Sequence, residues 1–160
     1  QPSLVKTVLD CLALHQVPPE MLILEVTETT AMSNPDESVR VLTELTDAGV
    51  KASIDDFGTG YSSLLYLKRL PACELKIDRA FVKELSGESE DATIVSAIVA
   101  LAKTLNLKVV AEGVETEAQQ AFLTELGCNT LQGYLLGKPV SAQTIEALCA
   151  RGEMLPGAEQ

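Results

Sequence analysis

Two neighbouring carboxylates, Asp55 and Asp56, are the first candidates for chemistry in this sequence. They follow an apolar stretch that begins at Val50, and they precede a loop that contains Gly58 and Gly60. Adjacent carboxylates repel each other, and a divalent cation removes that repulsion by binding their oxygens. Paired metal ions are also a common means of cleaving phosphate esters. A helix cap or a turn explains most Asp-Asp pairs in loops, so the pair alone leaves both interpretations open.

Other charged residues interrupt or follow apolar stretches. Glu25 lies within the apolar stretch 21–26, where a carboxylate needs a cation or several hydrogen bonds. Lys76 lies between Leu75 and Ile77, so in a strand its side chain points to the opposite face from theirs. A lysine among carboxylates can bind phosphate, position water or transfer a proton, whereas an exposed strand lysine does none of these.

Three more glutamates have both a structural and a functional interpretation. Glu28 could be a further metal ligand, could hold a neighbouring loop, or could cap a helix. Glu112 and Glu115 flank a Gly-Val pair directly after an apolar stretch. Without a site, they would be a loop carboxylate and an acidic residue in the first turn of a helix, which the helix dipole favours.

Apolar runs of strand length alternate with helical periodicity along the chain. The predicted strands are 21–26, 50–55, 73–77, 107–111 and 130–134, and the predicted helices are 4–12, 35–48, 64–67, 94–105, 118–126 and 141–148. This alternation predicts an α/β fold with parallel strands and right-handed helical connections.

Five strands fit either an open doubly wound sheet or part of a barrel. An open sheet gathers its site at one switch point, whereas a (β/α) barrel builds its site from the carboxyl ends of many strands. Here polar residues follow five successive strands, namely Glu25, Asp55, Lys76 with Asp78, Glu112, and Gln132. Their distribution favours a TIM-like barrel.

Composition narrows the function classes. The chain has 160 residues, enough for one domain, and its 12 basic and 23 acidic residues give a net charge of -11. This charge argues against DNA or RNA partners and against a membrane-surface patch, and no apolar run is long enough for membrane insertion. The four cysteines show no Cys-x-x-Cys spacing, and His15 is the one histidine. We therefore expect reduced thiols, a cytoplasmic location and no histidine base.

Taken together, the polar motifs closely resemble the EAL family of bacterial cyclic di-GMP phosphodiesterases. The resemblance extends from about Leu4 to Ala150. The motifs that carry it are Glu25–Glu28, Asp55–Leu64, Leu75–Arg79, Ala111–Thr116 and Leu131–Tyr134. The second of these is long and highly specific.

The resemblance implies an eight-stranded barrel of modified TIM type and a two-metal site that takes Mg2+ or Mn2+. It implies hydrolysis of cyclic di-GMP to the linear dinucleotide pGpG in bacterial second-messenger signalling, with regulation of biofilm formation and motility. Its metal ligands here would be Glu25, Asp55 and Asp56.

The resemblance also implies roles for eight further residues. Lys76 and Glu112 would orient and activate the attacking water, and Gln132 and Asp78 would complete the network around water and substrate. The loop 55–64 would be held by Glu28 and Glu115. Tyr134 and Pro139 would lie at the rim of a guanine site.

Two family motifs have no counterpart in these residues: the Glu-Ala-Leu strand and a later strand that supplies an asparagine ligand. We therefore expect residues 1–150 to form a partial barrel of about five βα units, followed by a tail over 151–160. We expect a homo-oligomer within a larger multidomain signalling protein, and an isolated chain that is inactive. A cyclic di-GMP receptor without hydrolysis, an interaction module of the same fold and a lyase with a Lys76 Schiff base are the alternatives.

Overall fold

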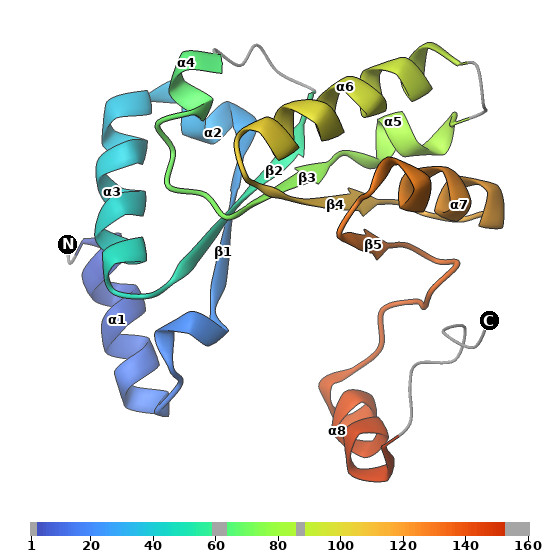
Figure 1. Cartoon of the computed structure of the whole chain (residues 1–160). Helices are drawn as coiled ribbons and strands as arrows, with labels where there is room; N and C mark the ends of the chain where they lie inside the picture. The colour runs from blue at the N-terminus through green and yellow to red at the C-terminus, as the bar shows by residue number, and fades with distance from the viewer. Residues whose placement is uncertain (1–2, 59–63, 86–88, 153–160) are drawn as a thin grey trace.

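Five parallel strands alternate with helices in the computed structural model, which describes residues 3–58, 64–85 and 89–152 (Figure 1). The strands are β1 (Ile23–Thr27), β2 (Lys51–Phe57), β3 (Glu74–Ile77), β4 (Lys108–Glu112) and β5 (Thr130–Gln132). Each strand is paired in parallel with the next strand along the chain, in the order β1-β2-β3-β4-β5. A doubly wound sheet would reverse this order at its switch point. The continuous order confirms the barrel-type topology.

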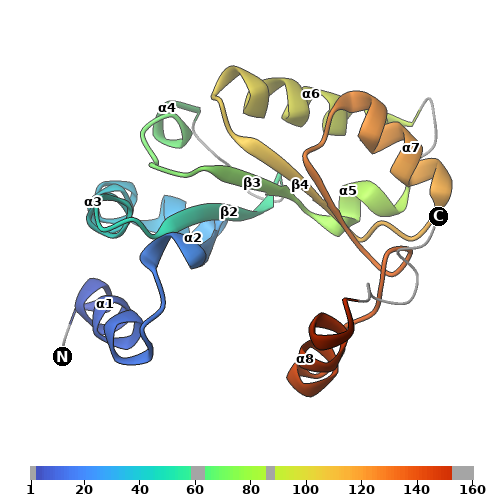
Figure 2. The same ribbon diagram turned by 60° about the horizontal axis from the view of Figure 1, so that its bottom comes forward.

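The helices lie mainly on one face of this sheet, as Figure 2 shows for the region from α3 to α7. The helical elements are α1 (Leu4–His15), η1 (Pro19–Met21), α2 (Glu28–Ser33), α3 (Pro35–Asp47), α4 (Leu64–Leu67), α5 (Arg79–Lys83), α6 (Glu90–Thr104), α7 (Glu117–Leu126) and α8 (Ala142–Arg151). Helix α8 stands apart from the sheet in both views (Figures 1 and 2). No helix in the three described segments is long and apolar enough to cross a membrane.

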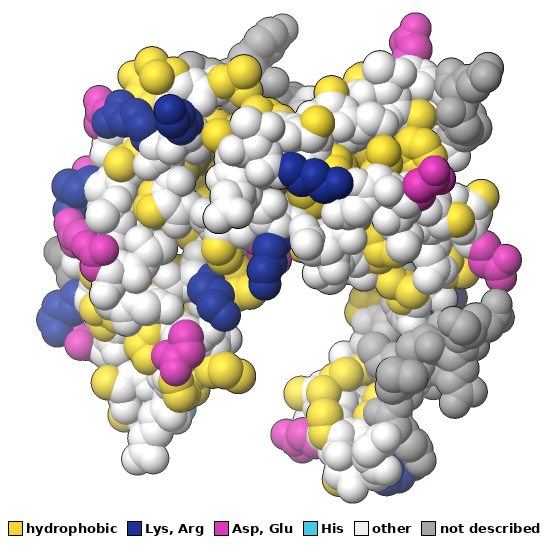
Figure 3. Space-filling view, viewed as in Figure 1, with side chains coloured by type: hydrophobic (Ala, Val, Ile, Leu, Met, Phe, Trp, Pro, Cys, Tyr) yellow, Lys and Arg dark blue, Asp and Glu magenta, His cyan; other side chains and the backbone are white. Residues whose placement is uncertain are grey.

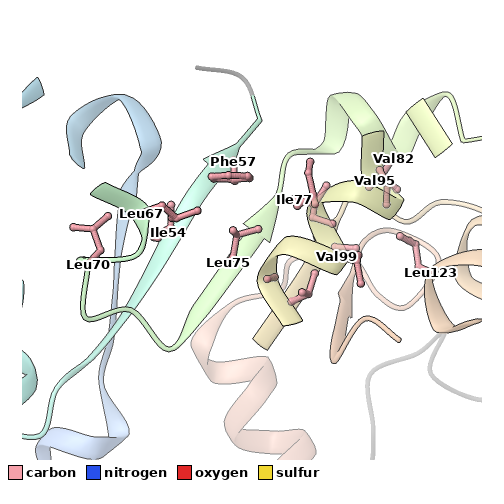
Figure 4. Close-up of a cluster of buried hydrophobic side chains, with 14 of the residues drawn as sticks. Ile54, Phe57, Leu67, Leu70, Leu75, Ile77, Val82, Val95, Val99 and Leu123 are labelled. Atoms are coloured by element: carbon pink, nitrogen blue, oxygen red, sulfur yellow. The ribbon is translucent and has the colours of Figure 1, made fainter. Parts of the chain in front are cut away.

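The core lies between the sheet and these helices. It contains alternate strand residues such as Ile54, Leu75 and Ile77, which pack with Val99 and Leu123 from the helices (Figure 4). Since side chains alternate along a strand, the intervening residues point to the opposite face. That face is the inner face of the partial barrel, and the molecule is hollowed on this side, between α1 and α8 (Figure 3). The predicted polar residues of β1 to β4 all lie on this inner face.

Several element boundaries differ from those predicted. Strand β1 begins at Ile23 instead of residue 21, because residues 19–21 form the 3-10 turn η1 after Pro18. Two short helices, α2 and α5, were not predicted, and each begins directly after a strand. Thr27 caps α2 through Thr30 N–H, and Asp78 caps α5 through Ala80 N–H. The predicted tail from residue 153 onward lies outside the described residues.

Candidate active site

A β-bulge in β2 brings the two adjacent aspartates to one side of the sheet. Ile54 pairs with Leu75 and Phe57 pairs with Ile77, so β2 has one extra residue between these points. Asp56 has the left-handed backbone conformation, with a φ of 53°. In a regular strand Asp55 and Asp56 would point to opposite faces. The bulge keeps Phe57 in the core and leaves both aspartates available to the inner face.

Lys76 joins three strands through its ammonium group. Its Nζ lies 2.8 Å from Glu112 Oε1, 2.9 Å from Glu25 Oε1 and 3.1 Å from Asp55 Oδ1. The side chain is 7% exposed, so the charge is largely removed from water. Burial alone would lower the pKa of Lys76, but the hydrogen bonds that its ammonium donates to Glu112, Glu25 and Asp55 outweigh burial and raise that pKa above its usual range. Lys76 is therefore a permanent cation at the centre of the site.

Three carboxylates form a compact cluster beside this lysine. One oxygen from each of Asp55, Asp56 and Glu112 lies within 4.8 Å of the others. Burial raises the pKa of Asp56, as do the neighbouring charges of Asp55 and Asp78 and a hydrogen bond with Asp78. Such crowding disfavours ionisation unless a cation is present.

The cluster fits a hard divalent cation. All of its donors are oxygens, which suit Mg2+, Mn2+ or Ca2+ better than softer metals. Metal–oxygen distances of about 2.0–2.6 Å allow one ion to contact all three groups of a cluster this size. The predicted ligand Glu25 is not one of these three residues, but its Oε1 lies 2.9 Å from the Lys76 ammonium that also contacts Asp55 and Glu112. Glu112, predicted to activate water, is a member of the cluster.

Glu28 lies apart from the carboxylate cluster and contacts the loop that follows β2. It is 1% exposed, and its Oε2 accepts a hydrogen bond of 2.8 Å from the backbone N–H of Gly58. This contact suits the predicted loop-holding role. Glu115 is exposed, and the centre of the loop that it was predicted to hold, residues 59–63, lies outside the described residues.

A pocket of about 410 Å3 adjoins the cluster. Among its lining residues are Glu112, Glu115, Gln132, Tyr134 and Pro139, all of which were predicted as site residues. Its volume lies within the range of ligand pockets. The pocket is therefore large enough to hold part of a nucleotide next to the carboxylates.

Two close backbone approaches shape this pocket. A Cβ atom added at Gly133 would lie 2.0 Å from the carbonyl oxygen of Val114. Gly113 has a φ of 72°, and an added Cβ would lie 2.6 Å from Cβ of Arg79. The loop after β4 is further held by Gln119, which accepts a hydrogen bond from Glu115 N–H. These close contacts explain why glycine occupies positions 113 and 133 of the Ala111–Thr116 and Leu131–Tyr134 motifs.

Two cations and one hydroxyl near the site were not predicted from the sequence. Arg79 and Lys138 line the pocket, and the Lys138 ammonium lies 5.8 Å from the centre of the Tyr134 ring. Ser53 lies on the inner face of β2, two residues before Asp55. The position of Arg79 after Asp78, at the end of β3, was a usable signal. Lys138 and Ser53 gave none, because their roles depend on contacts between distant segments.

Residues 1–139 match the EAL domain family, which covers most of the chain. The chain belongs to the EAL domain family. This membership confirms the relationship suggested by the sequence motifs and agrees with the barrel-type strand order.

Curated relatives match most of this EAL chain. The chain is 65% identical over 148 residues to the bifunctional diguanylate cyclase/cyclic di-GMP phosphodiesterase MucR of Pseudomonas aeruginosa, spanning 92% of this chain and 22% of MucR. It is 51% identical over 125 residues to the cyclic di-GMP phosphodiesterase NbdA of the same organism, spanning 78% of this chain and 16% of NbdA. The chain thus spans about a fifth of the length of these larger proteins.

Solved structures of EAL proteins share the fold. A structure described as the PaMucR phosphodiesterase in complex with c-di-GMP has a TM-score of 0.86 and 65% identity, and the match covers 89% of this chain and 57% of that chain. A Klebsiella pneumoniae BlrP1 calcium/cy-diGMP complex has a TM-score of 0.78 and 36% identity, covering 87% of this chain and 35% of that chain.

Proposed function

We propose that this chain is part of a metal-dependent phosphodiesterase domain that hydrolyses cyclic di-GMP to pGpG. The observation that carries the proposal is the group formed by Lys76, Asp55, Asp56 and Glu112 at the edge of a pocket that can hold part of a nucleotide. The names of its relatives MucR and NbdA support the same substrate. The parent protein would be a multidomain cytoplasmic or membrane-anchored signalling protein that acts as a homo-oligomer.

Asp55, Asp56 and Glu25 would hold Mg2+ or Mn2+, which supplies a nucleophilic water at neutral pH and neutralises phosphate charge. Glu112 would orient the attacking water and accept its proton. The Lys76 ammonium lies 2.8 Å from the Glu112 carboxylate and fixes its position. Asp78 and Gln132 would complete the network around the water and the substrate.

The pocket would bind the dinucleotide beside the cluster. Arg79 and Lys138 offer positive charge to phosphate oxygens, which a chain of net charge -11 would otherwise repel. Tyr134 is 62% exposed and has an aromatic face on which a guanine can stack. Glu28 and Glu115 would hold the loop 55–64, and Pro139 would complete the rim. The Glu-Ala-Leu sequence at residues 146–148 lies in helix α8, not in a strand of the sheet. We therefore also propose that the 160 residues turn over cyclic di-GMP slowly without the ligands that the family's Glu-Ala-Leu strand supplies.

The test is hydrolysis of cyclic di-GMP with Mg2+ by the full-length parent protein that contains this sequence. Asp55→Asn should lower kcat more than 100-fold, because it removes a metal ligand. The matched control is Asp10→Asn, which removes an exposed carboxylate paired with Lys6 on α1 and should leave turnover unchanged. Equal activity of Asp55→Asn and the parent would contradict the proposed site. Binding in Ca2+ without any hydrolysis in Mg2+ would show a receptor instead.

A further inference from the structure

Gln119 is a buried amide that joins two segments beside the pocket. It lies in the first turn of α7 and is 5% exposed. Its Oε1 accepts hydrogen bonds from the backbone N–H groups of Glu115, at 2.8 Å, and Thr116, at 3.0 Å. Its Nε2 donates to the carbonyl oxygens of Val82, at 3.0 Å, and Lys83, at 3.3 Å. One side chain thus connects the loop after β4 to the end of α5, which lies beside α7 (Figures 1 and 2).

The partners of Gln119 use both halves of its amide. Backbone N–H groups can bond only to its oxygen, and backbone carbonyls can bond only to its NH2 group. The reciprocal pair with Thr116 is a capping box at the start of α7, which a glutamate would supply equally well. The contacts with Val82 and Lys83 require a donor, which an ionised glutamate lacks. Helix capping alone therefore does not explain why an amide occupies this position.

Helix α5 depends on such contacts for its position. It has five residues, and an isolated helix of this length is unstable in water. Asp78 caps its first turn by accepting a hydrogen bond of 2.8 Å from Ala80 N–H, and Gln119 holds its last turn. The first residue of this helix is Arg79. The placement of Arg79 therefore depends on how α5 is held at both ends.

Arg79 meets the loop after β4 at the wall of the pocket. A Cβ atom added at Gly113 would lie 2.6 Å from Cβ and 3.3 Å from Cα of Arg79, so there is no room between them for a side chain at residue 113. Both residues line the pocket together with Glu112. The same loop is fixed to β5, because Val114 N–H donates a hydrogen bond of 3.0 Å to the carbonyl oxygen of Gln132. The spacing between Arg79 and Glu112 thus depends on how α5 is joined to this loop.

We propose that Gln119 is a positioning residue that sets the spacing between Arg79 and Glu112. Its NH2 group holds the helix that begins with Arg79, and its oxygen holds the loop that follows Glu112. This inference rests on the proposed phosphodiesterase function, in which Arg79 binds substrate phosphate and Glu112 activates water. It extends that function, because one buried amide serves phosphate binding through one half and the activation of water through the other.

Two substitutions of similar size separate these two contacts in the full-length parent protein that contains this sequence. Gln119→Glu keeps the acceptor and removes the donor, so it should release α5 and leave the loop in place. With Mg2+, KM for cyclic di-GMP should rise about 10-fold, as for the loss of one hydrogen bond to a charged phosphate, while kcat stays nearly unchanged. Gln119→Met removes both contacts, so kcat should also fall about 10-fold. The matched control, Gln120→Glu, changes the neighbouring amide on α7 and should alter neither constant.

A double-mutant cycle tests whether Gln119 acts through Arg79. In an Arg79→Ala background, Gln119→Glu should cause no further rise in KM. Equal effects of Gln119→Glu in both backgrounds would overturn the proposal. So would a lower melting temperature with unchanged KM, because this result would show that Gln119 serves only the stability of the fold.

Hydrogen exchange tests the two contacts without turnover. In Gln119→Glu, peptides that cover residues 79–85 should exchange faster than in the unmodified protein, while those that cover 113–118 keep their protection. In Gln119→Met, which buries no charge and decides the question if Gln119→Glu does not fold, both segments should exchange faster. Unchanged exchange of residues 79–85 in the folded variants would overturn the proposed link to α5. The expected exchange in a parent protein that does not hydrolyse cyclic di-GMP would instead contradict the proposed function.

Discussion

At the scale of single residues, buried charge in this chain is balanced locally. Lys76 has three carboxylate partners, and Glu28 is buried against the backbone N–H of Gly58. Burying an ion without a partner is costly, so each of these groups depends on the contacts around it. Changes at such residues should therefore affect stability more than changes at exposed residues of the same type.

Glu28→Ala should lower the free energy of unfolding by about 2 kcal/mol, because it leaves the N–H of Gly58 without its acceptor. Urea denaturation measures this change. The matched control is Glu117→Ala, since Glu117 is also the first residue of a helix but is exposed. A loss equal to that of the control would show that Glu28 acts only on the helix dipole.

The thiols should differ in reactivity. Burial raises the pKa of Cys128 to about 11, although the charge of Lys103 opposes that shift, whereas Cys11 and Cys149 are exposed. Because the thiolate is the reactive form, Cys128 should react slowest with a disulfide reagent at pH 8. Between the ordinary thiol pKa and about 11, the folded chain keeps a proton on Cys128 that the unfolded chain loses. Stability should therefore fall as the pH rises through this window. Fast labelling of Cys128 in the folded chain would contradict the predicted low reactivity of this thiol.

At the scale of elements, the bulge in β2 requires an unfavourable backbone at Asp56. A left-handed conformation is tolerated by Asn and Asp but strained in β-branched residues. Asp56→Asn should keep this geometry and remove repulsion from Asp55 and Asp78, so stability should rise by about 0.5–1 kcal/mol while metal affinity falls.

Asp56→Val provides the opposite case and should lower stability by about 1–3 kcal/mol, because Val resists a positive φ. Thermal unfolding of both variants measures the difference. Equal stabilities would mean that the bulge is not maintained by this residue.

The long elements could be predicted because they bury continuous apolar faces. Helix α6 and strands β2 to β4 were found from the spacing of apolar residues, and Gly49 and Gly127 marked helix ends through their positive φ. The short helices α2 and α5 were missed because, unlike the apolar α4, their five or six residues show too little apolar periodicity. Their signals were the capping residues Thr27 and Asp78.

The residues that form the site were easier to predict than their arrangement. Alternation along strands placed Glu25, Lys76 and Glu112 on one face, and the structure joins them directly. The bulge could not be predicted, since it depends on how β2 pairs with β3. For the same reason, the sequence did not predict that Glu112, rather than Glu25, groups with Asp55 and Asp56.

At the scale of the whole molecule, the sheet has two free edges. In the described segments, the outer sides of β1 and β5 have no neighbouring strand. Ile23, on β1, is 44% exposed. Free edges favour pairing with another chain, so we expect the 160 residues to associate at micromolar concentrations.

Ile23→Lys should shift this association toward monomer, because a charged edge residue opposes strand pairing. The control is Leu14→Lys, which changes an apolar residue of α1 that is 77% exposed and should leave association unchanged. Sedimentation velocity over a range of concentrations distinguishes them. Monomers at every concentration for the unmodified chain would exclude edge pairing.

The strand order also has a consequence for biosynthesis. Because each strand pairs only with its neighbours in the chain, the sheet can grow one strand at a time as the ribosome delivers them. Glu25 and Asp55 would then emerge and pack before Lys76, and their mutual repulsion would last until β3 arrived. Lys76 would thus offset one of these two negative charges during translation, well before Glu112 joins the site.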